Sequence, residues 1–354
     1  MSAYNRRFVL VTGASGFIGR HLARVLMERG YSVRAVYRRE NPPLMLKELE
    51  TKGAELLRLD LSVGENLLRA VSGVDRVIHA AAIASDWGKY EIFHKYNYEM
   101  AISLLEASKE SGCSVFVYLS SVSVHGFGNH VESTEEGPYY PPVSFYQETK
   151  KKAEDYVLAQ NQTGYDKEGN KLSGRALKTT VIRPGNVYGP EDGTTFFPIF
   201  EAMERGIMGY IGKGHTLTCP VYVEDLAEAV ILAMEKEESA GKCFNITGGE
   251  RVTWRELLKY CSSLLGCKPP VLSIPVPAAF FLAHLMEFIF KMIGIKSAPP
   301  LTLYRVAQLS HNYHFNISRA EKLLGFKPKI PWKEGFKRTV LDYLENYKPV
   351  EKSL

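Results

Sequence analysis

The first half of the sequence alternates short runs rich in β-branched residues with longer amphipathic segments. The short runs cover residues 8–13, 32–38, 54–60, 75–82, 114–121 and 179–185. Segments with helical periodicity lie between them, among them residues 146–159. A strand followed by a helix, repeated along a chain, requires right-handed crossovers and a parallel sheet with helices on both faces. The pattern therefore predicts an α/β fold with a doubly wound parallel sheet, the Rossmann arrangement that binds dinucleotides.

The pattern changes after Gly189, where mixed apolar segments with prolines replace the regular alternation. We therefore expect a Rossmann domain from residues 1–189, completed by about 220–248, and a smaller mixed substrate-binding lobe from 190–219 and 249–345. The polar stretch 161–177, rich in Gly, Asn and charged residues, predicts a surface excursion between a helix and a strand.

Charge and cysteine content exclude several classes of protein. The 44 basic and 39 acidic residues are spread along the chain with no block of one sign, so we expect no nucleic-acid partner. The five cysteines form no C-x-x-C and have no histidine at metal-ligand spacing, which predicts no metal site and a reducing, cytoplasmic environment. The apolar run FVLV near the N-terminus is too short for the core of an export signal.

One apolar segment, residues 277–295, raises the question of a membrane. It is interrupted by His284, Glu287 and Lys291, whereas a bilayer span needs about 20 residues with few charges. A buried or substrate-covering helix is the first interpretation. An interfacial helix that contacts a membrane peripherally is the second, and a true span is the last.

A glycine-rich turn, TGASGFIG, follows the first predicted strand and opens the next helix. Small residues let the backbone approach a pyrophosphate, and the helix N-terminus offers it free N–H groups. Position 15 is serine, a departure from G-x-G-x-x-G. The predicted cofactor-binding residues of this turn are Gly13, Ser15, Gly16, Phe17, Ile18 and Gly19.

The second predicted strand ends on Arg38 and Arg39, where an acidic residue would hold the adenosine ribose of NAD. An arginine there can pair with a 2′-phosphate, so Arg38 favours NADP, with NAD left open. A solvated arginine pair is the alternative. Asp60 is placed to meet the adenine, or else to cap the following helix. Further cofactor contacts are expected from Leu61, Ala80 and Ala81.

The sequence Tyr146-Gln-Glu-Thr-Lys150 carries the predicted chemistry. A tyrosine and a lysine at this spacing share one helix face, so the ammonium should stabilise the phenolate. A free tyrosine titrates near about pH 10, so general acid/base work near neutrality needs such a neighbour. Ser121 ends the fifth predicted strand and completes the set.

Together, TGASGFIG, YLSSVSVHG, YQETK and RPGNVYGP resemble the extended short-chain dehydrogenase/reductase (NAD-dependent epimerase/dehydratase) superfamily over nearly the whole chain. The resemblance implies that Ser121 is the catalytic serine, Tyr146 the acid/base and Lys150 the partner that binds the nicotinamide ribose. It also implies cofactor contacts from Asn97, Pro184 and Val187. His125 replaces a tyrosine that many members have, beside the expected substrate.

Within that superfamily, residues 298–340 and the preceding apolar stretch resemble the 3β-hydroxysteroid and sterol dehydrogenase branch. Residues 85–97 also resemble reductases of 2-alkyl-3-oxoalkanoic acids. Both groups imply a bulky apolar substrate bearing a hydroxyl or ketone. The substrate contacts we expect are Trp87, Ser123, Asn186, Phe196 and Phe197.

The resulting hypothesis is an NAD(P)-dependent oxidoreductase that interconverts a secondary alcohol and a ketone on a 3β-hydroxysterol or a long-chain 3-oxo or 3-hydroxy acid. A nucleotide-sugar epimerase or dehydratase with tightly bound NAD is the alternative, although residues 271–303 are apolar where a diphosphate would need polar contacts. A non-catalytic nucleotide-binding regulator fits less well, because Ser121, Tyr146 and Lys150 are all present. The resemblance also implies a homodimer, which no residue pattern tests.

Overall fold

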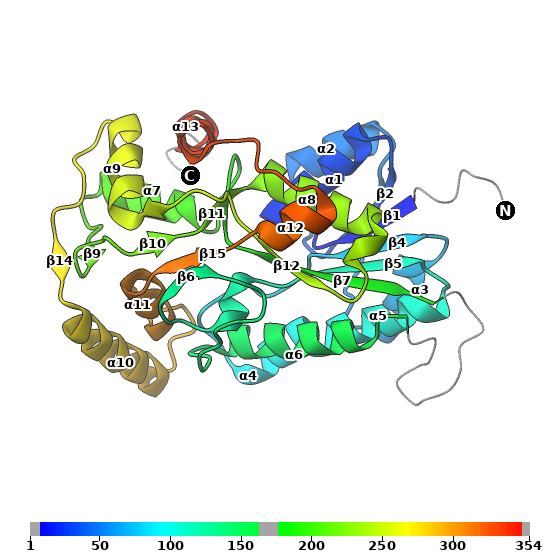
Figure 1. The fold of residues 1–354 in the computed structure, drawn as a ribbon, viewed down its shortest axis with the longest axis horizontal. Helices are drawn as coiled ribbons and strands as arrows, with labels where there is room; N and C mark the ends of the chain where they lie inside the picture. Colours follow the sequence, from blue (N-terminus) through cyan, green and yellow to red (C-terminus); the bar gives the residue numbers. More distant parts are fainter. Residues whose placement is uncertain (1–7, 163–175, 349–354) are drawn as a thin grey trace.

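A seven-stranded, fully parallel sheet forms the centre of the computed structural model, which describes residues 8–162 and 176–348 (Figure 1). The strand order β12-β7-β5-β4-β1-β2-β3 reverses direction between β1 and β4. The α/β doubly wound fold is thus confirmed, and all six predicted runs form strands of this sheet. The strands are β1 (Phe8–Thr12), β2 (Ser32–Tyr37), β3 (Glu55–Arg58), β4 (Arg76–His79), β5 (Val115–Leu119), β7 (Lys178–Pro184) and β12 (Cys243–Ile246).

Helices cover both faces of the sheet, as the crossover rule requires. One face packs against α1 (Phe17–Glu28), α2 (Leu44–Thr51), α8 (Val223–Glu235) and α12 (Ser318–Leu324). The other face packs against α3 (Gly64–Val71), α5 (Met100–Glu110) and α6 (Phe145–Ala159). The inner strands β1, β4, β5 and β7 are almost fully buried, which explains why most of them read as apolar runs in the sequence, whereas the edge strand β3 is partly exposed. Most of the stretch 161–177, the predicted surface excursion, lies outside the described residues.

Short elements complete the sheet domain, most of them near the carboxyl edge of the sheet. The helix α4 (Tyr90–Phe93) runs into the π-helix η2 (His94–Glu99), which continues into α5. The 3-10 helix η3 (Val122–His125) follows β5, and η4 (Glu237–Ser239) follows α8. Sequence periodicity gave no sign of the π-helix, a rare form that often marks functional sites.

A second lobe, built mainly from the second half of the chain, has its own aromatic core (Figure 1). Its helices are α7 (Phe196–Glu204), α9 (Trp254–Leu265), α10 (Val276–Ile293), α11 (Leu303–Ser310), α13 (Trp332–Asp342) and the π-helix η5 (Tyr343–Tyr347). Two-stranded ladders pair β8 (Asn186–Tyr188) with β11 (Pro220–Tyr222), β9 (Tyr210–Ile211) with β14 (Ser273–Ile274), β10 (Leu217–Thr218) with β13 (Val252–Thr253), and β6 (His130–Ser133) with β15 (Tyr313–Phe315). The β6–β15 ladder joins the segment after β5 to the C-terminal lobe.

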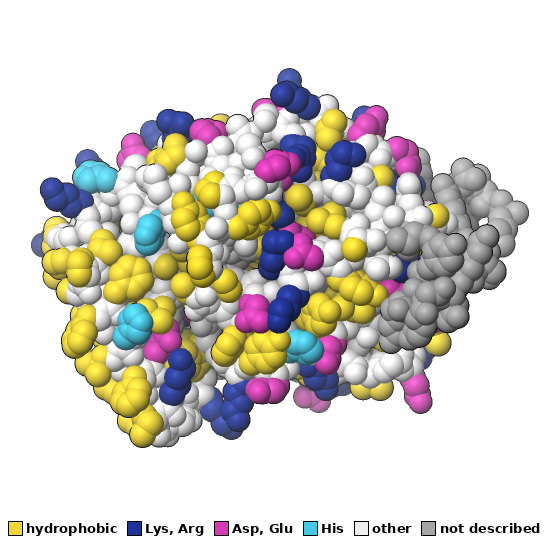
Figure 2. Space-filling view, turned by 60° about the horizontal axis from the view of Figure 1, so that its bottom comes forward, with side chains coloured by type: hydrophobic (Ala, Val, Ile, Leu, Met, Phe, Trp, Pro, Cys, Tyr) yellow, Lys and Arg dark blue, Asp and Glu magenta, His cyan; other side chains and the backbone are white. Residues whose placement is uncertain are grey.

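Helix α10 corresponds to the apolar segment and differs from its first interpretation. Only Ala279 and Ala283 are buried, and 11% of the helix is buried overall. The expectation of a buried helix is therefore wrong, whereas a substrate-covering helix stays a prediction. Hydrophobic side chains gather on the surface in this region (Figure 2). Among the residues that the structure describes, α10 is the one helix long and apolar enough to cross a membrane by length and composition.

Candidate active site

A cavity of about 260 Å³ opens at the carboxyl ends of β1, β2, β3 and β4. This is the point where the strand order reverses, the place where doubly wound sheets bind their ligands. Eight of the predicted cofactor residues line it: Gly13, Ser15, Gly16, Arg38, Asp60, Leu61, Ala80 and Ala81. The sequence analysis missed Tyr96 and Met100, which line the opposite wall.

The glycine turn is packed so closely that side chains would not fit. A Cβ atom on Gly13, which has φ +68°, would lie 2.7 Å from the Cα of Ala81. On Gly19 it would lie 2.3 Å from the carbonyl oxygen of Gly13. Helix α1 begins directly after Gly16 and has no side-chain cap, so its first N–H groups face the cavity edge. This cradle fits a dinucleotide pyrophosphate. Phe17, Ile18 and Gly19 form the first turn of α1 and do not line the cavity.

Arg38 and Asp60 stand at the far end of the cavity. The Arg38 guanidinium lies 4.9 Å from the centre of the Tyr96 ring, and the Lys95 ammonium lies 5.6 Å from the same ring. Asp60 accepts a hydrogen bond from the backbone N–H of Ser62 at 2.9 Å. Burial raises the pKa of Asp60, but the Ser62 hydrogen bonds and the charges of Arg38 and Lys95 bring it below its ordinary value. Asp60 therefore both caps the local turn and borders the cavity.

Asn97 lies one step behind the cavity. It is 1% exposed, its Oδ1 accepts from the N–H of Ile83 at 2.7 Å, and its Nδ2 donates to the Ile83 carbonyl at 3.1 Å. Its position on η2 turns it towards this loop, which follows β4 and forms a wall of the cavity. Asn97 therefore holds the wall, and no contact of Asn97 with the cavity itself is seen.

Ser121 and Tyr146 are brought together from two elements. Ser121 caps η3, where its side chain accepts from the N–H of Ser123 at 3.1 Å. Tyr146 lies in the first turn of α6, directly after the Ser144 cap. Burial raises the pKa of Tyr146, and a hydrogen bond with the Ser121 side chain opposes that rise. The net pKa is above the ordinary value, so the phenol is protonated near neutrality.

Lys150 lies one turn further along α6 and is 2% exposed. Its ammonium donates to the carbonyl of Leu119 and lies 4.2 Å from the centre of the Tyr118 ring. Burial lowers the pKa of Lys150 to about 7, against the opposing charge of Glu154. The sequence predicted that this ammonium lowers the pKa of Tyr146. In this structure the Lys150 ammonium faces β5 instead, and the Ser121 side chain is the group that opposes the rise in the pKa of Tyr146.

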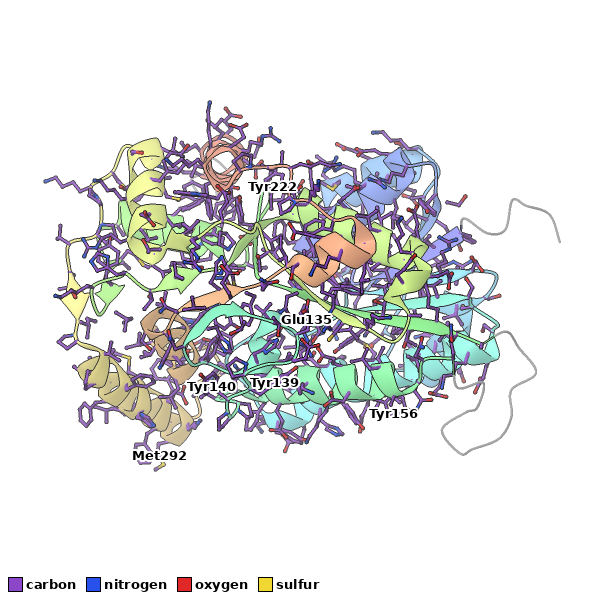
Figure 3. The ribbon with its side chains drawn as sticks, in the orientation of Figure 1. Glu135, Tyr139, Tyr140, Tyr156, Tyr222 and Met292 are labelled. Carbon is purple, nitrogen blue, oxygen red and sulfur yellow. The ribbon has the colours of Figure 1, made fainter. Side chains whose placement is uncertain are left out.

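A buried ion pair beneath Lys150 was not foreseen. Glu154 and Arg183 are paired side chain to side chain, with 3.0 Å between the arginine Nε and the carboxylate Oε2. Arg183 also contacts His125 Nε2 at 3.0 Å and donates to the Glu135 carbonyl at 2.9 Å and the Tyr139 hydroxyl at 3.0 Å. Figure 3 labels Glu135 and Tyr139 of this network, next to α6. The sequence feature that could have revealed Glu154 is its spacing, since Tyr146, Lys150 and Glu154 follow one another at four-residue intervals along one helix face.

His125 belongs to this buried network and does not stand beside the substrate as expected. Its side chain is fully buried and its ring stacks on Tyr139 at 4.6 Å between centres. Burial and the charge of Arg183 lower the pKa of His125 to about 3, so it is neutral and can accept from the guanidinium.

The remaining predicted residues separate into different regions. Phe196 and Phe197 are 0% and 2% exposed and pack in the aromatic core of the second lobe, so we no longer assign them to the substrate. Trp87 lies against α10, with its ring 6.4 Å from that of Phe290. Asn186 donates to Thr218 Oγ1 at 2.8 Å and accepts from Gln308 at 3.0 Å.

The segment that joins the two parts of the molecule holds two more predicted residues. Pro184 is the last residue of β7, and Val187 lies on β8, packed partly against the main core. Ser123 on η3 is 2% exposed and faces Tyr304 of α11, a residue that the sequence analysis did not single out.

A parallel sheet with a glycine cradle at its switch point and a Ser–Tyr–Lys set beside it defines a dinucleotide-dependent enzyme. Residues 9–247 match the NAD dependent epimerase/dehydratase family, and the chain belongs to that family. The predicted superfamily and the prediction of an NAD-dependent enzyme acting on hydroxyl or keto groups are thus confirmed.

Individual relatives extend over nearly the whole chain. It is 30% identical to a 2-alkyl-3-oxoalkanoate reductase of Stenotrophomonas maltophilia (strain K279a), over 93% of this chain and 97% of that protein. It is also 30% identical to the decarboxylating sterol-4-alpha-carboxylate 3-dehydrogenase of Mus musculus, over 94% of this chain and 90% of that protein. Among solved structures, a UDP-glucose 4-epimerase of Thermotoga maritima with UDP-glucose has a TM-score of 0.73 at 26% identity, covering 96% and 99% of the two chains.

Proposed function

We propose that this protein interconverts a secondary alcohol and a ketone on a hydrophobic substrate, with NAD(P) as the hydride carrier. The observation that carries the proposal is the interaction of the Ser121 and Tyr146 side chains, next to a buried apolar cluster that includes Val122. The same cluster contains Phe127 and Ala307, and Phe280 packs against it. Two relatives support the substrate class, since their names give a 3-oxoalkanoate and a sterol carboxylate oxidised at position 3.

The nicotinamide, when bound, supplies the hydride that moves to or from the carbinol carbon. The protein's own task is to bind the reacting oxygen and move its proton. Ser121 and Tyr146 present two hydroxyls to that oxygen. Because burial keeps Tyr146 protonated, the site is ready to donate a proton, which is the step that ketone reduction needs. In alcohol oxidation the same proton returns to Tyr146.

The first test is Tyr146→Phe, which removes the proton donor and keeps the ring. We expect turnover of a hydrophobic ketone to fall by at least about 100-fold, the usual contribution of a positioned acid or base. Dinucleotide affinity should stay unchanged. Tyr98→Phe, on η2, is the control and should keep wild-type activity. A Tyr146→Phe variant with most of its activity would refute the assignment.

Arg38 leads us to propose NADP as the preferred form of the cofactor. It lines the cavity beside Arg39, and a guanidinium can pair in bidentate fashion with a 2′-phosphate. Arg38→Ala should weaken NADP binding by roughly tenfold, the effect of losing one such pair, and leave NAD binding nearly unchanged. Equal effects on the two dinucleotides would show that Arg38 only borders the adenosine.

A nucleotide-sugar epimerase is the second candidate, favoured by the likeness to the Thermotoga maritima enzyme over nearly the whole chain. The two candidates differ in net redox change. Purified protein should be mixed with NAD or NADP and a panel of hydrophobic 3-hydroxy compounds and UDP-sugars, and nicotinamide absorbance followed. Net reduction of the dinucleotide by an apolar alcohol supports the first proposal. Conversion of a UDP-sugar without net redox change favours the second.

Helix α10 leads us to propose peripheral contact with a membrane, from which an apolar substrate could be drawn. Phe281, Leu285, Phe288 and Met292 repeat at helical spacing and are 68%, 44%, 62% and 72% exposed. Met292 points away from the body of the molecule (Figure 3). Phe288→Ser together with Met292→Ser should abolish sedimentation with phospholipid vesicles. Wild-type protein that stays in the supernatant would contradict the proposal.

A further inference from the structure

The two hydroxyls assigned to the reacting oxygen lie on separate elements. Ser121 caps η3, which follows β5, whereas Tyr146 lies in the first turn of α6. Between them the chain forms β6, which pairs with β15 of the C-terminal lobe. Contacts between η3 and α6 must therefore hold the two hydroxyls at a fixed distance. Such contacts matter for catalysis, because a displacement of about 1 Å in a reacting group can cost on the order of 100-fold in rate.

Gln147, the residue after Tyr146, makes a contact of this kind. Its side chain is 1% exposed, and its Nε2 donates to the carbonyl oxygen of Ser123 on η3 at 3.0 Å. Its Oε1 accepts from the backbone N–H of Val143 at 2.9 Å and from the hydroxyl of Ser144 at 3.3 Å. These partners fix the orientation of the amide, because turning it over would set its NH2 group against an N–H and its oxygen against a carbonyl.

The carbonyl that Gln147 contacts belongs to the residue that holds the Ser121 side chain. The N–H of Ser123 donates to Ser121 Oγ at 3.1 Å, and the Ser123 carbonyl also accepts from the N–H of Gly126 at 2.9 Å. Ser123 is thus joined to Ser121 through its N–H and to α6 through its carbonyl. A shift of Ser123 would therefore move Ser121 relative to Tyr146.

A helix cap alone would not require an amide at this position. Gln147 is the third residue of α6, where a capping box uses a side chain that accepts hydrogen bonds, and a carboxylate serves there as well as an amide. Helix α9 has such a box, formed by Thr253 and Glu256. An ionised carboxylate in place of the Gln147 amide could still accept from Val143, but it has no proton to donate to Ser123. The Nε2 donor therefore distinguishes the contact with η3 from the cap.

We propose that Gln147 is a positioning residue, which sets the distance between the Ser121 and Tyr146 hydroxyls by joining η3 to the start of α6. This inference rests on the proposed function for the roles of Ser121 and Tyr146, and it applies to either candidate substrate. Gln147 acts through the backbone of Ser123 and not on the substrate itself. Its loss should therefore lower kcat more than it raises KM, and it should leave dinucleotide affinity unchanged.

Gln147→Glu tests the donor with almost no change of shape. The introduced carboxyl lies in the interior, so burial raises its pKa above the ordinary value of about 4.3. Below that pKa the carboxyl is protonated and can donate to the Ser123 carbonyl, as Nε2 does, whereas above it the carboxylate can only accept. We therefore expect the ratio of variant to wild-type kcat to be near one at low pH and to fall by roughly tenfold as the pH rises, the effect of one hydrogen bond.

The ratio is used because the elements around Gln147 carry other titratable groups. These are found on α6, η3, α4 and α11, and they include Tyr146, Lys150, Lys151, His125, Tyr90 and Tyr304. Wild type and variant share them, so their titration cancels in the ratio. A ratio that stays constant with pH, or a loss confined to KM, would overturn the proposal.

Glu256→Gln is the matched control. It makes the reverse exchange of a carboxyl and an amide, at the same position of a helix, in the capping box of α9. The kcat of this variant and its pH dependence should stay at wild-type values. A pH-dependent loss of the same size in this control would show that the effect belongs to capping boxes in general, and the positioning role of Gln147 would be refuted.

Gln147→Met allows a measurement that needs no turnover. It removes the hydrogen bonds of the amide without adding a charge. Hydrogen exchange followed by mass spectrometry reports on the N–H groups of Ser123, Val124 and Gly126, which are hydrogen-bonded within η3. We expect these amides to exchange roughly tenfold faster in the variant, whereas β5 should keep its wild-type protection. Unchanged exchange at η3 would show that Gln147 does not hold this segment, whatever the activity.

The two measurements separate this inference from the proposed function. Faster exchange at η3 in a protein that turns over neither a hydrophobic 3-hydroxy compound nor a UDP-sugar would support the contact of Gln147 with η3 and refute the proposed function. Faster exchange together with wild-type kcat would show that the contact only stabilises the fold, and the positioning role would be wrong.

Discussion

The buried ion pair next to Lys150 leads to a prediction about stability. The side chains of Glu154 and Arg183 are 0% and 2% exposed, and the carboxylate meets both Nε and Nη2 of the guanidinium. Removing one partner of a buried pair costs about 3–5 kcal/mol, because the other charge is left in the interior. Glu154→Gln keeps an amide oxygen that can still accept from Arg183. We therefore expect a loss near the lower limit, about 3 kcal/mol in the free energy of unfolding.

The assay is equilibrium denaturation by urea of the wild-type protein and its variants. Asp155→Asn is the matched control, since Asp155 is the next residue of α6 and pairs with Lys151 at the surface, with side chains 58% and 33% exposed. That pair should contribute less than about 1 kcal/mol. Replacing both Glu154 and Arg183 by apolar residues of similar size should recover part of the lost stability. A Glu154→Gln variant as stable as Asp155→Asn would mean that His125, Tyr139 and the Glu135 carbonyl stabilise the guanidinium on their own.

Two further predictions concern the cavity and the lysine. Gly19→Ala places a Cβ 2.3 Å from the Gly13 carbonyl oxygen and should weaken dinucleotide binding by at least about tenfold in a fluorescence titration. Gly64→Ala is the control, because Gly64 has open space around it and its replacement should leave binding unchanged. Equal binding by both variants would contradict the packing argument. The pKa of Lys150 is about 7 in the fold, whereas an unfolded lysine titrates near about 10.4. Between these pH values the unfolded chain binds more protons, so Lys150 makes the free energy of unfolding rise with pH. Lys150→Met should flatten that rise in denaturation curves recorded across this pH range, and parallel curves would show that Lys150 titrates normally.

The sequence was sufficient for the parts of the molecule that local pattern determines. The strands of the sheet have continuous apolar runs, and the glycine turn has a spacing that only a tight strand-to-helix connection explains. The alternation of strands and helices also places Ser121 at the end of the fifth strand, and Tyr146 and Lys150 on the helix after it. Ser121 lies two residues after β5, and Tyr146 and Lys150 lie on the helix that connects β5 to β7, so the prediction needed little tertiary information.

The substrate side could not be predicted in the same way. Phe196 and Phe197 adjoin Pro198, and an apolar pair of this kind does not reveal whether it faces a core or a pocket. Tyr304 and Tyr313 carry no motif, and Tyr313 meets the first half of the chain through its pairing with His130 in the β6–β15 ladder. The composition of residues 277–295 showed that the segment is hydrophobic, but it did not show which face of the helix packs against the rest of the protein. In each case the missing information was a contact between distant parts of the chain.

The parallel pairing of β15 with β6 also bears on how the protein comes to be active during synthesis. Tyr313 of β15 pairs in register with His130 of β6. Strand β6 is therefore synthesised well before its partner strand. The residues that line the dinucleotide cavity come from the first third of the chain, whereas α11 and β15 are made near the end. The residues that line the dinucleotide cavity are therefore synthesised well before the β6–β15 ladder can form, and the C-terminal lobe is completed last.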